Sequence, residues 1–348
     1  MYGGGRWGLE AATPPTPPSS FSASRFFATD ESGYPSSDAQ PAGGDSVLSV
    51  AVASPEDALR SPGPFRLVAQ LSDPHIVEAG ALCMDRIDTA GFLRRALETL
   101  SQLRPAPELL LCSGDLVNDG RPEQYAHLRE LLSGLAFPVH LMCGNHDDRA
   151  ALRAAFPDHH YLGVYGPCDY VVDALEPLRL IALDTMVANT ASGQLSTDQL
   201  HWLDRQLAAG PEQPTLVAMH HPPFATGIAH MDAMGLELRA ARALADVLRR
   251  HPQVERVLCG HLHRSITHRF ANTVACVVPS CAHAIGLDLG ADDDAGSWTD
   301  EPPAVALHLW SKPVGVVTHL RTIGHFPAHR FGPADPEGIE TPPANQHG

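Results

Sequence analysis

Residues 108–120 read Glu-Leu-Leu-Leu-Cys-Ser-Gly-Asp-Leu-Val-Asn-Asp-Gly, an unbroken apolar run followed at once by a glycine and an aspartate. A short, continuous apolar run bounded by turn residues is typical of a strand buried on both faces. The glycine before Asp115 lets the backbone approach a neighbour closely or adopt an unusual φ where that strand ends. The segment therefore predicts a buried strand, Glu108–Ser113, that delivers a carboxylate into the loop after it.

Four more apolar segments are followed by polar side chains in the same way. They are Phe65–Ser72 before Asp73-Pro74-His75, Val139–Cys143 before Gly144-Asn145-His146-Asp147, Leu216–Met219 before His220-His221-Pro222-Pro223, and Val257–Cys259 before Gly260-His261-Leu262-His263. In open α/β sheets, ligands bind at the edge where the strands end. Each motif alone is weak, because Gly-Asp is a common turn and a lone buried histidine usually makes an ordinary hydrogen bond. The specificity lies in the ordered set of five.

The segments between these strands predict helices. We expect helices over Asp88–Leu103, Pro122–Leu135, Ser196–Ala209 and Leu236–Arg249, with a shorter one near Arg149–Phe156. Further strands are expected at Tyr170–Val172, Leu178–Leu183, Ile266–Phe270, Thr273–Val278 and Ala304–Leu309, the last three mainly antiparallel. Ser196 and Gln199 have the spacing of a capping box. Helices that alternate with buried strands indicate a layered α/β sandwich.

Composition shifts along the chain predict its domain organisation. Residues 1–64 contain 9 Pro, 8 Gly and 11 Ser, which is typical of a disordered tail. A folded domain is expected at residues 65–290, followed by a small strand-rich C-terminal extension at 291–332 and a second tail at 333–348.

The charge and cysteine content exclude several classes of protein. The 348 residues include 24 basic and 40 acidic ones, a formal net charge of −16, whereas a general binder of nucleic acid or anionic lipid should show a basic face. No apolar run approaches the ~20 residues of a membrane helix. The seven cysteines include no Cys-x-x-Cys pair, and no secretory signal is visible, so we expect a cytoplasmic protein.

Seven of the side chains after the strands form a set of nitrogen and oxygen donors without a thiolate. They are Asp73, His75, Asp115, Asn145, His220, His261 and His263. A mixture of imidazole and carboxylate suits Mn, Fe, Zn or Co better than Ca or Mg. Seven donors exceed what one metal with an open position needs, and they fit two metals bridged by one carboxylate.

The five motifs, in this order, resemble those of the calcineurin-like metallophosphoesterase superfamily over about residues 66–290. Ser113–Tyr125 and Met219–Phe224 are similar to the class III cyclic-nucleotide phosphodiesterase branch, which includes a glycerophosphodiesterase subgroup. The resemblance implies a four-layer α/β/β/α sandwich and a homo-oligomer, either a dimer or a larger assembly.

The resemblance also implies a role for each motif residue. Asp73, His75 and His263 would hold one metal ion, and Asn145, His220 and His261 the other, with Asp115 bridging them. The ligand of the His-His pair would be His220 and not His221. His146 would be no ligand but would face the leaving group.

We therefore expect a metal-dependent phosphoric diester hydrolase that acts on small diesters, either 3',5'-cyclic nucleotides or glycerophosphodiesters. Two divalent ions of the manganese, iron, zinc or cobalt class would hold the phosphate and generate a bridging hydroxide for attack. His146 would donate a proton to the departing alkoxide. The predicted substrate-binding residues are His146, Asn145 and His230, whereas Cys281 and His283 are interpreted as structural.

Two alternatives stay open. A broad-specificity phosphoesterase or nuclease would use the same ligands, although the lack of basic stretches weighs against long nucleic acid. A non-catalytic scaffold with this fold would be expected to have lost ligands, and all seven are present together with His146.

Overall fold

Two β-sheets form the centre of the computed structural model, which describes residues 64–290, 296–327 and 329. The five-stranded sheet has the order β13-β12-β1-β2-β3. Its strands are β1 (Arg66–Leu71), β2 (Leu109–Cys112), β3 (Val139–Leu141), β12 (Ala304–Ser311) and β13 (Gly315–Thr322). β1, β2 and β3 are parallel, whereas β12 pairs antiparallel with both β1 and β13.

The second sheet has six strands in the order β4-β5-β6-β7-β9-β8. They are β4 (Tyr170–Val172), β5 (Arg179–Leu183), β6 (Thr215–Met219), β7 (Val254–Cys259), β8 (Ile266–Phe270) and β9 (Thr273–Val277). The four central strands are parallel, and β4 and β8 lie antiparallel at the two edges. β10 (Ala284–Ile285) and β11 (Trp298–Thr299) pair antiparallel and form a two-stranded ribbon.

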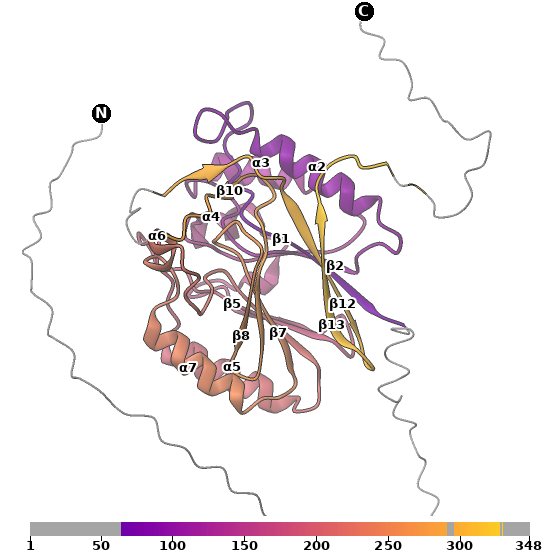
Figure 1. Ribbon diagram of the computed structural model, residues 1–348, viewed down its shortest axis with the longest axis vertical. Helices are drawn as coiled ribbons and strands as arrows, with labels where there is room; N and C mark the ends of the chain where they lie inside the picture. Colours follow the sequence, from indigo (N-terminus) through magenta and orange to yellow (C-terminus); the bar gives the residue numbers. More distant parts are fainter. Residues whose placement is uncertain (1–63, 291–295, 328, 330–348) are drawn as a thin grey trace, which may run out of the picture. The chain divides into compact units, whose positions relative to one another are not determined.

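Helices cover the outer face of each sheet. The side of the five-stranded sheet carries α2 (Thr89–Ser101), α3 (Pro122–Leu131) and α4 (Arg149–Ala155), and the side of the six-stranded sheet carries α5 (Thr197–Ala209) and α7 (Leu238–Arg249). Two short turns, η1 (His160–Leu162) and α6 (Ala229–Asp232), lie in connecting segments. Figure 1 shows α2 and α3 on one side of the sheets and α5 and α7 on the other.

Alternating side chains of the strands explain the layers. In β2, Leu110 and Cys112 pack toward the helices, whereas Leu109 and Leu111 face the other sheet. The six-stranded sheet repeats this arrangement, because Val217 faces α5 and α7 while its neighbours on β6 face inward. Side chains of a strand alternate between its two faces. A strand that is apolar at every position therefore has both faces buried. The four-layer α/β/β/α sandwich is confirmed.

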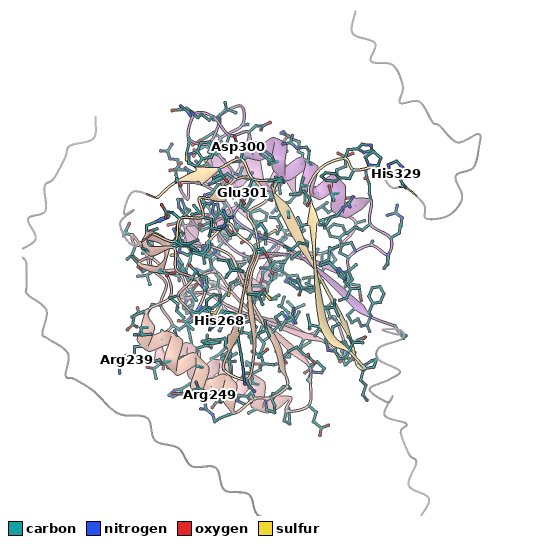
Figure 2. All side chains as sticks on the ribbon, viewed as in Figure 1. Arg239, Arg249, His268, Asp300, Glu301 and His329 are labelled. Atoms are coloured by element: carbon teal, nitrogen blue, oxygen red, sulfur yellow. The ribbon has the colours of Figure 1, made fainter. Side chains whose placement is uncertain are left out.

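The helices begin where the sequence predicts. The Asp88 side chain accepts a 2.7 Å hydrogen bond from the Gly91 N–H at the start of α2. The capping box of Ser196 and Gln199 is present at the start of α5. On α7, Arg239 and Arg249 are exposed, at the end of the view opposite Asp300 and Glu301 (Figure 2).

The C-terminal strands β12 and β13 join the five-stranded sheet. β12 pairs with β1 along its length, with Val68 opposite His308, so part of the predicted extension at 291–332 belongs to the five-stranded sheet. β13 was not predicted, because its residues are mostly exposed or half-buried and lack an apolar pattern. The predicted tails lie outside the described residues, apart from residue 64. In the described part of the chain, no helix combines the length and apolar character needed to cross a bilayer.

Candidate metal centre

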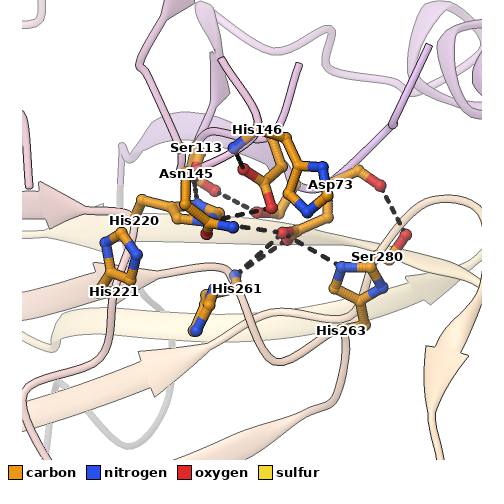
Figure 3. Close-up of polar contacts among 12 residues, drawn as sticks. Asp73, Ser113, Asn145, His146, His220, His221, His261, His263 and Ser280 are labelled. Atoms are coloured by element: carbon orange, nitrogen blue, oxygen red, sulfur yellow. Dashed lines mark hydrogen bonds and ion pairs between the residues drawn. The ribbon is translucent and has the colours of Figure 1, made fainter. Parts of the chain in front are cut away.

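The ends of five parallel strands bring the predicted ligands together from both sheets. Asp73 and His75 follow β1, Asp115 follows β2 and Asn145 follows β3, while His220 follows β6 and His261 and His263 follow β7. The two sheets are joined at this edge, since the His261 N–H donates to Oδ1 of Asp73 at 3.1 Å (Figure 3). The sequence predicts convergence at one sheet edge, and in the structure the side chains converge where the two sheets meet.

The backbone of these loops is strained. Five of the nine non-glycine residues with positive φ in the described part of the chain are predicted ligands: Asp73 (53°), His75 (43°), Asp115 (48°), His261 (72°) and His263 (51°). Left-handed conformations are costly for residues with a Cβ and concentrate at functional sites. Gly144 is needed for a different reason, because an added Cβ would collide with Oδ1 of Asp115.

Asp115 stands between the two predicted halves of the ligand set. Its Oδ2 lies 3.6 Å from Nε2 of His75 and 3.4 Å from Nε2 of His220. The Nε2 atom of His220 is also 3.2 Å from Oδ1 of Asn145. This arrangement suits a carboxylate shared by two cations.

Asp73 occupies the other side of the cluster. Its Oδ1 lies 3.4 Å from Nε2 of His263 and 4.0 Å from Nε2 of His220. The Nε2 atoms of His75 and His263 are 3.2 Å apart. Ligand atoms of Asp73, His75, Asp115 and His263 all lie within 4.8 Å of one another, and the same holds for His220, His221 and His261. Two groups of His and Asp donors thus suggest a dinuclear metal site.

Hydrogen bonds to the outer ring nitrogens point the histidines at the cluster. Nδ1 of His220 donates to the Ser113 carbonyl at 2.8 Å, and Nδ1 of His263 donates to the His283 carbonyl at 3.1 Å. A carbonyl only accepts, so the Nε2 lone pair of each ring is left for a metal. Within the described structure, the buried Nε2 of His261 has no hydrogen-bond partner. Such an orphaned nitrogen fits a metal ligand.

His221 differs from its neighbour His220. Its Nδ1 is 2.8 Å from Oγ1 of Thr185, and its Nε2 is 3.1 Å from the Ala191 carbonyl. Both ring nitrogens are therefore engaged, although one of them lies near those of His220 and His261. The geometry supports the prediction that His220 is the ligand of the pair.

The charge states of the cluster suit a cation. Burial opposes ionisation of Asp73 and Asp115, but nearby histidines outweigh it, so the pKa of Asp73 is lowered and that of Asp115 falls well below its usual value. Burial lowers the pKa of His75 and His261 well below 6.5, which keeps both rings neutral. Burial also opposes protonation of His220, yet the Asp115 carboxylate raises its pKa to about 9. Metal binding would displace that proton.

His146 is the exposed histidine of the site. Its backbone N–H donates to Oδ1 of Asp115 at 2.9 Å, and the ring Nδ1 donates to the Asn118 carbonyl at 2.7 Å. Its ring meets that of His75 edge-on, with the ring centres 4.6 Å apart. The second ring nitrogen is left to exchange a proton, as a general acid requires.

The hydrogen bonds of the Asp147 carboxylate go to residues other than His146, and the side chain that caps α4 is that of Asp148. Its buried carboxylate accepts hydrogen bonds from the N–H groups of Gly144 (2.8 Å) and Leu116 (3.1 Å). Asp147 therefore joins the loop after β2 to the loop after β3.

A cavity of about 390 Å³ opens onto the cluster. Its lining consists of His75, Met84, Asp115, Asn118, Asn145, His146, Ala191, Met231, Met234, His261, His263, His283 and Ile285. Of the predicted substrate-binding residues, Asn145 and His146 are in this set. His230 is not, and its ring lies against Gly296.

The sequence favoured a structural role for His283, whose buried ring lines the cavity 4.5 Å from that of His263, centre to centre. Its Nδ1 has no hydrogen-bond partner in the described structure. The signal was present, because His283 follows β9, a further parallel strand that ends at the same sheet edge. The methionines of the lining come from segments without a strand-end pattern.

Comparison with known proteins identifies the family. The family model for calcineurin-like phosphoesterases matches residues 67–265. A probable glycerophosphodiester phosphodiesterase of Arcobacter nitrofigilis is 34% identical over 260 residues, covering 75% of this chain and 94% of the relative. A probable cyclic nucleotide phosphodiesterase of Rhodococcus erythropolis is 35% identical over 237 residues, covering 66% of this chain and 75% of the relative.

Among solved structures, a dimetal phosphatase of Danio rerio has a similar fold. The TM-score is 0.51 at 16% sequence identity, over 75% of this chain and 100% of that one.

Proposed function

Because the chain belongs to the calcineurin-like phosphoesterase family, we propose that it is a metal-dependent hydrolase of small phosphodiesters. The observation that carries the proposal is the position of Asp115, whose Oδ2 is within 3.6 Å of one histidine from each half of the ligand set. The diester class is supported by the two relatives, which are named for glycerophosphodiesters and for cyclic nucleotides.

The proposed division of the ligands is the one that the resemblance implies. Asp73, His75 and His263 would hold one divalent ion, and Asn145, His220 and His261 the second, with Asp115 shared. Imidazole and carboxylate donors favour manganese, iron, zinc or cobalt. When bound, two such ions supply positive charge against the phosphate oxygens and acidify the attacking water.

The chain's own residues would handle the proton of the leaving group. Nδ1 of His146 is committed to the Asn118 carbonyl, which leaves Nε2 to protonate the departing alcohol oxygen. The hydrogen bond from the backbone N–H of His146 to Asp115 keeps this residue, and so its ring, beside the cluster. Asn145 and His146 both line the cavity and would contact the phosphate, and His230 stays a predicted contact at its rim.

The test begins with protein reconstituted with Mn, Fe, Zn or Co and analysed for metal content. We expect two metal ions per chain and hydrolysis of bis(4-nitrophenyl) phosphate. Cyclic AMP and a glycerophosphodiester should be cleaved faster than phosphate monoesters. Asp115→Asn should lose metal and activity, whereas Asp204→Asn, which changes contacts with Arg250 (2.9 Å) and His251 (2.7 Å) on the helix side of the six-stranded sheet, should keep both.

Other outcomes would favour the alternatives. Metal-loaded protein that cleaves no diester would indicate a scaffold, and a preference for long nucleic acid would indicate a nuclease. We also expect a cytoplasmic homo-oligomer, which light scattering and cell fractionation would check.

A further inference from the structure

The cavity at the metal centre has two chemically different parts. One part is the ring of Asp, Asn and His side chains described above. The other consists of Met84, Ala191, Met231, Met234 and Ile285, all apolar. A volume of about 390 Å³ is at the small end of ligand sites, so a diester whose phosphate lies at the histidines would contact this apolar part with an ester group.

Met84 is presented by a tight turn. The Cys83 N–H donates to the Ile87 carbonyl and the Ile87 N–H donates to the Cys83 carbonyl, both at 2.9 Å. Met84 has a φ of 51°, a conformation that is costly for a residue with a Cβ. It is 49% exposed, although the turn is closed by two hydrogen bonds. The turn thus holds an apolar side chain at the cavity instead of burying it.

The two other methionines come from α6 and the residues after it. Met231 and Met234 are three positions apart, and the Met234 N–H donates to the Met231 carbonyl at 3.0 Å, so both lie on one side of the turn. Asp232 fixes the preceding loop, because its carboxylate accepts hydrogen bonds from the N–H groups of Thr226 (2.7 Å) and Gly227 (2.8 Å). These hydrogen bonds therefore hold this portion of the apolar part of the cavity in place without a substrate.

Ala191 and Ile285 are held by neighbouring segments. The Gly193 N–H donates to the Gly235 carbonyl at 3.1 Å, which joins the Ala191 loop to the end of the α6 segment. Arg264 donates to the Ile285 carbonyl and forms a bidentate ion pair with Glu301, with N–O distances of 2.9 and 3.0 Å. Four separate segments, which carry Met84, Ala191, the Met231–Met234 pair and Ile285, thus form one apolar surface.

The chemistry of this surface selects among the diesters. In the described lining there is no lysine, arginine or hydroxyl side chain, and no phenylalanine, tyrosine or tryptophan. Hydroxyls of a ribose or glycerol group would lose water there without gaining a side-chain partner, which is costly. Methionine is flexible and polarisable and suits an apolar group of variable shape.

We propose, building on the function proposed above, that one ester group of the natural substrate is an apolar alcohol that lies against Met84, Met231 and Met234. A nucleoside or a free glycerol group is disfavoured at this position. The phosphate and the second ester oxygen would remain at the histidine side of the cavity.

The test uses methyl alkyl phosphates with ethyl, butyl and hexyl chains, and measures kcat/KM from the monoester product by phosphorus NMR. Transfer of a methylene group from water to apolar surroundings corresponds to about fourfold in affinity. The apolar part of the cavity covers only one side of the alkyl chain of the substrate. We therefore expect kcat/KM to rise roughly two- to fourfold per methylene. Hexyl methyl phosphate should then exceed both cyclic AMP and methyl glyceryl phosphate.

Variants locate the effect. Met84→Gln and Met234→Gln keep side-chain length but add a polar amide, and each should reduce the ratio of hexyl to ethyl kcat/KM several-fold. Leu320→Gln, on β13 and 46% exposed, is the matched control and should leave the ratio unchanged. Thermal unfolding of each variant shows whether it is folded.

The two proposals fail in different ways. If metal-loaded protein cleaves bis(4-nitrophenyl) phosphate but kcat/KM is flat across the alkyl series, or if cyclic AMP or the glyceryl diester is preferred, the apolar ester site is wrong and the phosphodiesterase stands. If no diester is cleaved, the proposed function itself is wrong.

Discussion

The Tyr125 hydroxyl on α3 donates a 2.8 Å hydrogen bond to Oδ1 of the buried Asp147 carboxylate and accepts one of 2.8 Å from the Asp148 N–H. Asp147 in turn holds N–H groups of the two loops that carry Asp115 and Asn145. Burial, together with the Asp115 charge, raises the pKa of Asp147 to about 7. A helix on the outer face of the sheet thus stabilises the loops of the metal centre.

Replacing Tyr125 by Phe should destabilise the protein and loosen these loops. Hydrogen bonds to charged groups contribute roughly 1.5–3 kcal/mol, and we expect a loss of this size in the free energy of unfolding, measured with urea at about pH 8.5, where the Asp147 carboxylate is ionised. The metal content at limiting metal concentration should fall as well. Tyr165→Phe is the control, because Tyr165 is 87% exposed. Equal stability of the two variants would show that the Tyr125 bonds contribute nothing.

Replacing His146 by Ala should separate metal binding from turnover. The variant keeps all seven predicted ligands, so its metal content should match the wild type. Its kcat for alkyl leaving groups should fall about 10²–10⁴-fold, the usual contribution of a general acid. Bis(4-nitrophenyl) phosphate should be affected less, because nitrophenolate leaves without a proton. An equal loss on both kinds of substrate would remove His146 from the proton transfer.

The two adjacent histidines after β6 should behave differently. His220→Ala removes a nitrogen that lies 3.4 Å from Asp115 and should lower the bound metal from two ions to one or none. His221→Gln leaves that nitrogen in place and should keep both ions, since His221 already bonds to Thr185 and Ala191. Elemental analysis of the two variants decides the assignment. Loss of metal from His221→Gln alone would reverse it.

The sequence predicts the part of the site that strand ends create. The motif strands are apolar at nearly every position because both faces are buried, and the polar residue after each one stands out. Asp115 and His220 could therefore be placed at one sheet edge without coordinates. Only the spatial arrangement shows that they come from different sheets and lie 3.4 Å apart.

Other features could not be predicted because no local pattern encodes them. Met84 and Met234 lie in irregular segments, so their position at the cavity depends on long-range packing. The pairing of Tyr125 with Asp147 joins a helix to a loop 22 residues away. β13 has exposed positions throughout and is placed by its pairing with β12, which itself was predicted.

A buried histidine of the five-stranded sheet should make the stability of the metal-free protein depend on pH. His308 on β12 is 1% exposed and bonds to Gln70 and Thr318, each at 2.9 Å. Burial, and then the charge of Arg256, lower its pKa from 6.5 to about 3. Above pH 6.5 the ring is neutral in both the folded and the unfolded state and has no effect. As the pH falls below 6.5, only the unfolded state binds the proton, so stability is lost progressively until about pH 3.

Between pH 7.5 and pH 5, His308 should lower the free energy of unfolding by roughly 2 kcal/mol. The loss begins near pH 6.5 and amounts to about 1.36 kcal/mol for each pH unit below it. Urea unfolding of metal-free wild type and His308→Gln at both pH values measures the difference. The variant is expected to be less stable at pH 7.5 but to lose about 2 kcal/mol less on acidification, because glutamine cannot be protonated. His319→Gln, at an exposed position on β13, is the matched control. If His308→Gln and the wild type lose the same stability between the two pH values, His308 takes up its proton in the folded protein, and its burial does not exclude the charge.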